Sequence, residues 1–125
     1  MKIMNYEETL TFKKDFKKLH KKFRTLSKDL EVAKRNAIEL YHIKRHDNQS
    51  VFFIPRFCSE RIQICKLKKF ACRSLKGRGV KSGIRIIYAF FPKKTRVVFI
   101  EIYFKGDKQN EDQSRIKEYL KFLTS

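Results

Sequence analysis

Residues 76–83 are the part of the chain whose residue types best suit a phosphate contact. This segment holds three glycines and three cations, Lys76, Arg78 and Lys81. Glycine lets the backbone turn tightly and approach a ligand closely, and cationic side chains on such a turn can bind phosphate oxygens. The spacing differs from the G-x-x-x-x-G-K-[ST] pattern of nucleoside triphosphatases. The segment is therefore either a phosphate-contacting loop or a plain hairpin loop with solvated cations.

Cysteine and histidine, the usual ligands of transition metals, show no ligand spacing here. Cys58, Cys65 and Cys72 stand seven residues apart, whereas structural zinc sites usually hold pairs two to four residues apart. Their odd number, with no close pair, also argues against a disulfide framework. We expect the cysteines to pack as small hydrophobic side chains in or near strands, and we expect no metal and no other cofactor.

The net charge indicates a polyanionic partner. Thirty-one Lys and Arg oppose 13 Asp and Glu, which gives +18 on 125 residues. A compact chain must tolerate this self-repulsion, and nucleic acid, an anionic membrane or an acidic protein would offset it. No apolar run approaches the roughly 20 residues that a membrane-spanning helix needs, and residues 1–10 contain no signal-like apolar region. We expect a cytoplasmic protein that binds nucleic acid, RNA above all, and no membrane.

The N-terminal half predicts two helices. Apolar residues recur at helical spacing between positions 12 and 26, and lysines fill the other faces. Ser27 is a candidate N-cap for a second helix that extends to about residue 43, because Asp29 and Glu31 would fall in its first turn. With so short a join, the two helices should form an antiparallel hairpin. A weak strand, around residues 6–11, would precede them.

The C-terminal half predicts antiparallel strands followed by a helix. Residues 84–91 and 96–104 are rich in β-branched and aromatic side chains, and residues 92–95 would join them as a hairpin loop. Pairing Phe91 with Arg96 would place Glu101 and Tyr103 on the same face as Tyr88. Residues 51–54 and 62–75 are further strand candidates, and Asn110 could cap a last helix with Ile116 on its apolar stripe. The predicted fold is α+β, one domain over residues 1–125, with a helix hairpin packed on a small antiparallel sheet and a C-terminal helix.

Three segments of the chain resemble one protein superfamily. They are Ser74-Leu75-Lys76-Gly77, the strand Ser82-Gly83-Ile84-Arg85-Ile86-Ile87-Tyr88, and Glu101-Ile102-Tyr103. Together with the N-terminal stretch TFKKDFKKLHKKF and the order of elements, they resemble the RelE/ParE superfamily of bacterial type II toxins. The segment from 44 to 61 is longer than in the compact members.

The resemblance implies one of two activities and one kind of partner. RelE-like members cleave messenger RNA without metal, usually on the ribosome, whereas ParE-like members inhibit DNA gyrase. Both are neutralised by a cognate acidic antitoxin. We expect the first activity, with mRNA and ribosomal RNA as partners in a bacterial cytoplasm. A gyrase inhibitor, or a basic RNA-binding protein without catalysis, is the alternative.

The resemblance also implies site residues. Metal-free RNA cleavage needs a base for the ribose 2′-OH, cations on the phosphate and an acid for the leaving 5′ oxygen. Arg85 matches the strand arginine that contacts phosphate in the ribonucleases, although it could instead pair with a neighbouring acid. Lys76, Arg78 and Lys81 could share this work, one of them as base. Glu101 could serve as base or could pair with a nearby cation.

Substrate contacts and the general acid complete the expected site. The predicted substrate-binding residues are Lys105, Lys108, Tyr88 and Tyr103. Tyr119 is expected in the core of the last helix, and no histidine follows residue 46. The general acid is therefore not identified.

Overall fold

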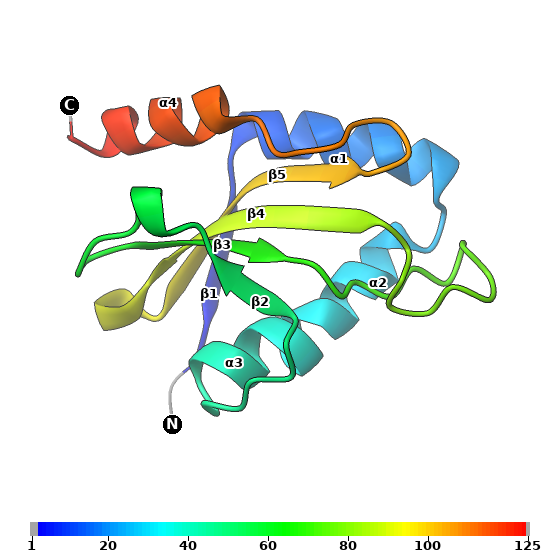
Figure 1. Ribbon diagram of the computed structural model, residues 1–125, viewed down its shortest axis with the longest axis horizontal. Helices are drawn as coiled ribbons and strands as arrows, with labels where there is room; N and C mark the ends of the chain where they lie inside the picture. The colour runs from blue at the N-terminus through cyan, green and yellow to red at the C-terminus, as the bar shows by residue number, and fades with distance from the viewer. Residues whose placement is uncertain (1–2, 125) are drawn as a thin grey trace.

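The structure, a computed structural model, describes residues 3–124 and is built on a five-stranded mixed sheet (Figure 1). The strands are β1 (Asn5–Glu8), β2 (Val51–Phe53), β3 (Gln63–Leu67), β4 (Ile84–Phe91) and β5 (Arg96–Phe104). Their order across the sheet is β1-β5-β4-β3-β2. The predicted α+β class is confirmed, but the sheet is not purely antiparallel, because β1 pairs parallel to β5 at one edge.

Helices cover the two faces of the sheet differently. Behind the sheet in Figure 1 lie α1 (Leu10–Lys22) and a rod made of α2 (Leu26–Ala33), a π-helical turn (Lys34–Glu39) and α3 (Leu40–His42). The C-terminal helix α4 (Gln113–Thr124) packs on the other face through the buried Ile116. A short helical turn, η2 (Pro55–Phe57), lies beside α4, where Arg56 donates a 3.0 Å hydrogen bond to Gln113. None of the helices in residues 3–124 is long and apolar enough to cross a membrane.

The helix boundaries differ from those predicted. The first helix ends at Lys22, because Phe23 has extended backbone angles, and Leu26 begins the next helix. The helical spacing of the apolar residues did not reveal this break, because Phe23 and Leu26 lie on either side of it and are both buried in the same core. Thr25, not Ser27, is the N-cap of α2. Asp112, not Asn110, precedes α4 and accepts hydrogen bonds from the Arg115 N–H.

The long central hairpin contains a bulge that changes which side chains share a face. Phe91 pairs with Arg96 as predicted, but the register shifts between Ile87 and Tyr88, so that Ile87 faces Glu101 and Arg85 faces Tyr103. The extra residue is Ile100. A one-residue shift moves every following side chain to the other face. The prediction that Glu101 and Tyr103 share a face with Tyr88 is therefore wrong.

The remaining candidate strands are shorter than the sequence predicted. Residues 51–53 do form an edge strand, but the strand expected over 62–75 ends at Leu67. Beyond it the chain is irregular, with Phe70 and Cys72 still buried in the core. All three cysteines are free thiols, and Cys65 and Cys72 are buried, as expected for small hydrophobic side chains.

A partly buried histidine borders the core on the helix side. The His42 ring stacks on Phe90 with ring centroids 4.0 Å apart, and its Nε2 lies 2.8 Å from the Tyr88 hydroxyl. Burial lowers the pKa of His42 from 6.5 to about 4, because an apolar environment disfavours the charged imidazolium. His42 is therefore neutral in the folded protein at pH 7.

We expect His42 to make the fold sensitive to mild acid. Its folded pKa lies below its unfolded value, so the unfolded chain binds more protons between pH 6.5 and 4. Stability from this group is therefore present above pH 6.5 and is lost as the pH falls towards 4, by on the order of 2–3 kcal/mol. Urea titrations at pH 7 and pH 4.5 should show a larger fall in the free energy of unfolding for the wild type than for His42→Gln. Equal falls in both proteins would contradict this role.

Candidate nucleic-acid interface

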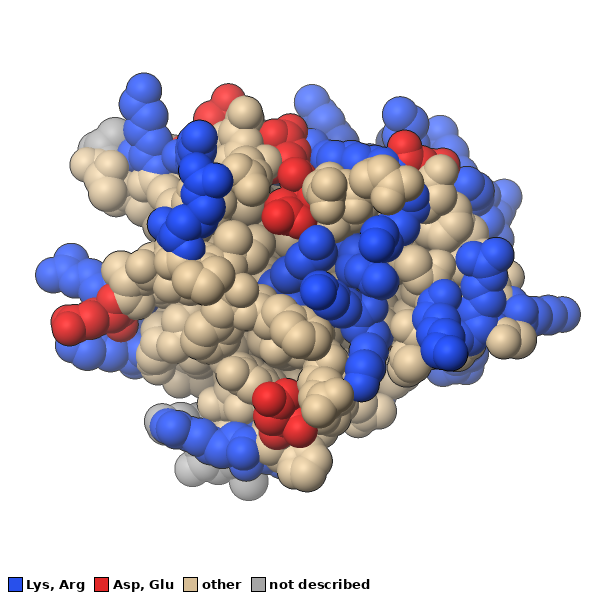
Figure 2. All heavy atoms as spheres, viewed as in Figure 1, with Lys and Arg blue, Asp and Glu red and all other residues tan. Residues whose placement is uncertain are grey.

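The face of the sheet that carries α4 is covered over only part of its area. The helix α4 and the turn η2 pack on Ile62, Ile64, Ala89 and Val98. The other part, where β3 ends and β4 begins, is open, and Figure 2 shows Lys and Arg side chains gathered there. We call it the basic end of the sheet, formed by Lys66, Lys68, Arg85, Glu101, Tyr103, Lys108 and Glu111.

Arg85 lies at the centre of this basic end. Its Nη1 donates to the backbone carbonyls of Lys68, at 2.8 Å, and of Ile84, at 3.3 Å. No carboxylate in residues 3–124 forms a salt bridge with Arg85 or with Lys68. These two cations therefore keep their charge available for an anion. The alternative that the sequence left open, an ion pair of Arg85 with a neighbouring acid, is not formed with any carboxylate of residues 3–124.

Beside them, Lys66 and Glu111 form a partly buried ion pair. Their Nζ and Oε1 atoms lie 2.8 Å apart, and their side chains are 16% and 13% exposed. Burial by itself would lower the pKa of Lys66, but contacts with Glu111 and Tyr103 raise it overall. Burial would raise the pKa of Glu111, but Lys66 lowers it overall. At neutral pH the pair thus consists of a charged ammonium and an ionised carboxylate.

Glu101 is buried and engaged through both of its carboxylate oxygens. Its Oε2 pairs with Lys108, and its Oε1 accepts a 2.8 Å hydrogen bond from the Asp112 backbone N–H. These contacts tie the loop after β5 to the sheet and fix the start of α4. Of the two uses that the sequence left open for Glu101, pairing with a cation is the one this geometry supports.

The two tyrosines predicted to bind substrate lie on opposite faces. Tyr103 is at the basic end, with Lys66 Nζ 5.9 Å and Lys108 Nζ 5.6 Å from its ring centroid. Burial raises the pKa of its hydroxyl. Tyr88 is fully buried on the helix side and bonded to His42. A substrate cannot reach Tyr88, so its predicted role is corrected to that of a core residue.

The glycine-loop cations lie apart from this cluster. Lys76, Arg78 and Lys81 are exposed on the loop that projects from the sheet between β3 and β4 (Figure 1). Among the described residues, their side chains form no salt bridge or hydrogen bond with the basic end. Gly77 and Gly79 adopt positive φ angles of 80° and 54°, which suit tight turns. Lys105 is also exposed, and its backbone N–H bonds to the Gly83 carbonyl at 2.9 Å.

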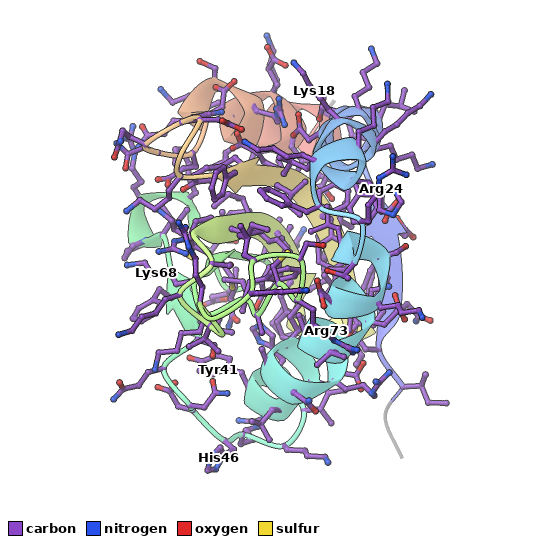
Figure 3. All side chains as sticks on the ribbon, turned by 90° about the vertical axis from the view of Figure 1, so that its right-hand side faces the viewer. Lys18, Arg24, Tyr41, His46, Lys68 and Arg73 are labelled. Carbon is purple, nitrogen blue, oxygen red and sulfur yellow. The ribbon has the colours of Figure 1, made fainter. Side chains whose placement is uncertain are left out.

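Three residues of the basic end were missed in the sequence. Lys66, on β3, and Lys68, just after it, flank the buried Leu67. Their two-residue spacing, typical of side chains on one face of a strand, was the available signal. Figure 3 shows Lys68 on the opposite side of the sheet from Arg24. Glu111 lies in the loop before α4, and its contact with Lys66 places it at the site.

Neither a cluster of metal ligands nor a known relative indicates what this site does. In residues 3–124 no group of three or more His, Cys, Asp or Glu side chains could hold a metal ion. No protein-family model, curated protein or solved structure matches the chain. The chemistry of the site must therefore be argued from its own side chains.

Proposed function

We propose that this protein is a RelE-like toxin that cleaves messenger RNA on the ribosome and is neutralised by an acidic antitoxin. The observation that carries the proposal is that Arg85 and Lys68, which form no salt bridge with a carboxylate of residues 3–124, lie beside the Lys66–Glu111 ion pair. The cations can bind the scissile phosphate, and arginine suits this because its planar fork can bind phosphate bidentately. The Lys66–Glu111 ion pair supplies one group that can accept a proton, the Glu111 carboxylate, and one that can donate a proton, the Lys66 ammonium.

The proposed reaction is a 2′-OH attack on the adjacent phosphorus. Glu111 accepts the 2′-OH proton, the new O2′–P bond forms and the P–O5′ bond breaks. The Lys66 ammonium protonates the leaving O5′, which gives a 2′,3′-cyclic phosphate and a 5′-hydroxyl end. The attacking O2′ and the leaving O5′ lie on opposite sides of the phosphorus, so the base and the acid cannot stay in contact with each other. The substrate phosphate must therefore draw Lys66 away from Glu111. Afterwards the proton returns from Glu111 to Lys66 and the pair is reset.

Induction in a bacterial host, followed by mapping of new 5′ ends on its mRNAs, tests the proposal. The wild type should produce cuts at codon-related positions in translated regions. Arg85→Ala should reduce them at least about 100-fold, because it removes a donor to the developing phosphate charge. Arg24→Ala is the matched control, since Arg24 is an exposed cation on the opposite side. Growth arrest without new cuts would overturn the ribonuclease and direct attention to gyrase inhibition.

A second candidate function is RNA binding without cleavage. It is favoured by the ion pairing of both carboxylates at the basic end, Glu101 with Lys108 and Glu111 with Lys66. If these pairs persist in the complex, the site has cations for phosphate but no free base. Neither growth arrest nor cuts, together with salt-sensitive binding to RNA, would support this alternative.

A further inference from the structure

An exposed aromatic ring borders the basic end. Phe52 belongs to β2, the outermost strand of the sheet, and its side chain is 41% exposed. Phe52 pairs with Lys66 in the antiparallel ladder, so the two side chains lie on the same face. A large apolar ring on an open face loses the stabilisation that burial would give. Its exposed position beside the basic end therefore calls for a reason other than the stability of the fold.

One cation of the site, Lys68, contacts this ring. Lys68 Nζ lies 4.5 Å from the Phe52 ring centroid, within the range of a cation–π contact. The Lys68 carbonyl in turn accepts the hydrogen bond from Arg85. Across the sheet face the order is therefore an exposed aromatic ring on β2, then Lys66 on β3 with Lys68 just after it, and then Arg85 on β4.

We propose that Phe52 is a stacking platform for one unpaired base of a single-stranded RNA, while Lys68 and Arg85 hold an adjoining phosphate. Proteins that bind single strands combine a cationic surface along the backbone with aromatic side chains under the bases. A base within a duplex has both of its faces already stacked, so this platform selects single-stranded RNA. The inference rests on the proposed function, because it assigns RNA to the same site, and it adds how the strand is recognised.

The chain offers a matched control for Phe52. Phe53 is the next residue on the same strand and is also 41% exposed. Its ring lies on the other side, 6.0 Å from the Tyr41 ring between centroids. Replacing either phenylalanine removes a similar amount of exposed apolar surface, but of the two rings only that of Phe52 borders the cations of the basic end.

The test uses a single-stranded RNA about ten nucleotides long that carries 2-aminopurine and a 2′-O-methyl group on every ribose. The probe cannot be cleaved, and its fluorescence falls when the 2-aminopurine stacks. Wild-type protein should quench it. Phe52→Leu should weaken binding about 5- to 100-fold and lose the quenching, whereas Phe53→Leu should bind within about twofold of the wild type and Phe52→Tyr should retain both signals. Thermal melts of the variants check that each is folded.

Three results would overturn the inference. They are wild-type binding without quenching, equal affinity for the same sequence as a duplex, and equal losses in Phe52→Leu and Phe53→Leu. The readout does not depend on cleavage. If the protein quenches the probe but cuts no mRNA, the stacking platform is supported and the ribonuclease is overturned. If the protein cuts mRNA but Phe52→Leu changes neither binding nor quenching, the ribonuclease is supported and the stacking platform is overturned.

Discussion

Replacing Glu111 with glutamine is expected to lower the rate constant for RNA cleavage at least about 100-fold, as the loss of a general base does. Glutamine has nearly the same shape and can still accept a hydrogen bond from Lys66, but it cannot take the 2′-OH proton. The Michaelis constant should change little, since Arg85 and Lys68 still bind the phosphate. Single-turnover cleavage of ribosome-bound mRNA measures both effects.

The pH dependence of cleavage gives a second signature of Glu111. A base acts only when it is ionised, and the Lys66 contact holds the pKa of Glu111 below its usual value of 4.5. The pH profile of kcat/KM reports the ionisations of the free enzyme, in which this contact is made. Its acidic limb should therefore lie below the ordinary carboxylate range, and kcat/KM should stay constant between about pH 6 and pH 7. Glu118→Gln, which alters an exposed carboxylate on α4, should leave the rate unchanged. Near-normal cleavage by Glu111→Gln would exclude Glu111 as the base.

The general form of this fold follows from local patterns in the sequence. The two long strands of the central hairpin were predictable because β-branched and aromatic residues fill them on both faces. The same composition concealed the bulge at Ile100. With apolar side chains on both faces, no alternation marks where one residue is inserted, and only the packing of Ile100 beside Val98 and Ile116 on the α4 side reveals it.

The candidate site was predictable in part, since Arg85, Glu101, Tyr103 and Lys108 were named from the sequence and Lys66, Lys68 and Glu111 were not. Arg85 interrupts an apolar strand, and a charge in such a place needs a polar contact or open solvent, which the basic end provides. Lys66 and Lys68 were hidden in a run of lysines whose phase depends on where β3 stops. Glu111 could not be found from local sequence at all, because its position depends on contacts 45 residues apart along the chain.

The largest loss of stability is expected from Glu101→Ala, about 2–4 kcal/mol. Glu101 is 1% exposed, and the substitution leaves the Asp112 N–H without its acceptor and Lys108 without its counter-ion. Breaking a buried pair by removing one partner usually costs about 3–5 kcal/mol. The half-exposed Lys108 can turn to water, so the expected loss is about 1 kcal/mol lower than that range. Urea denaturation at pH 7 would measure the loss.

Glu101→Gln separates the structural role of this residue from a catalytic one. The amide oxygen can still accept from the Asp112 N–H, so the variant should lose less stability than Glu101→Ala and remain folded well below its melting temperature. If Glu101 only holds the loop after β5, this variant should cleave at close to the wild-type rate at 20 °C. A folded Glu101→Gln protein that no longer cleaves would instead make Glu101 the base, and Glu111 would then serve only to hold Lys66 in place.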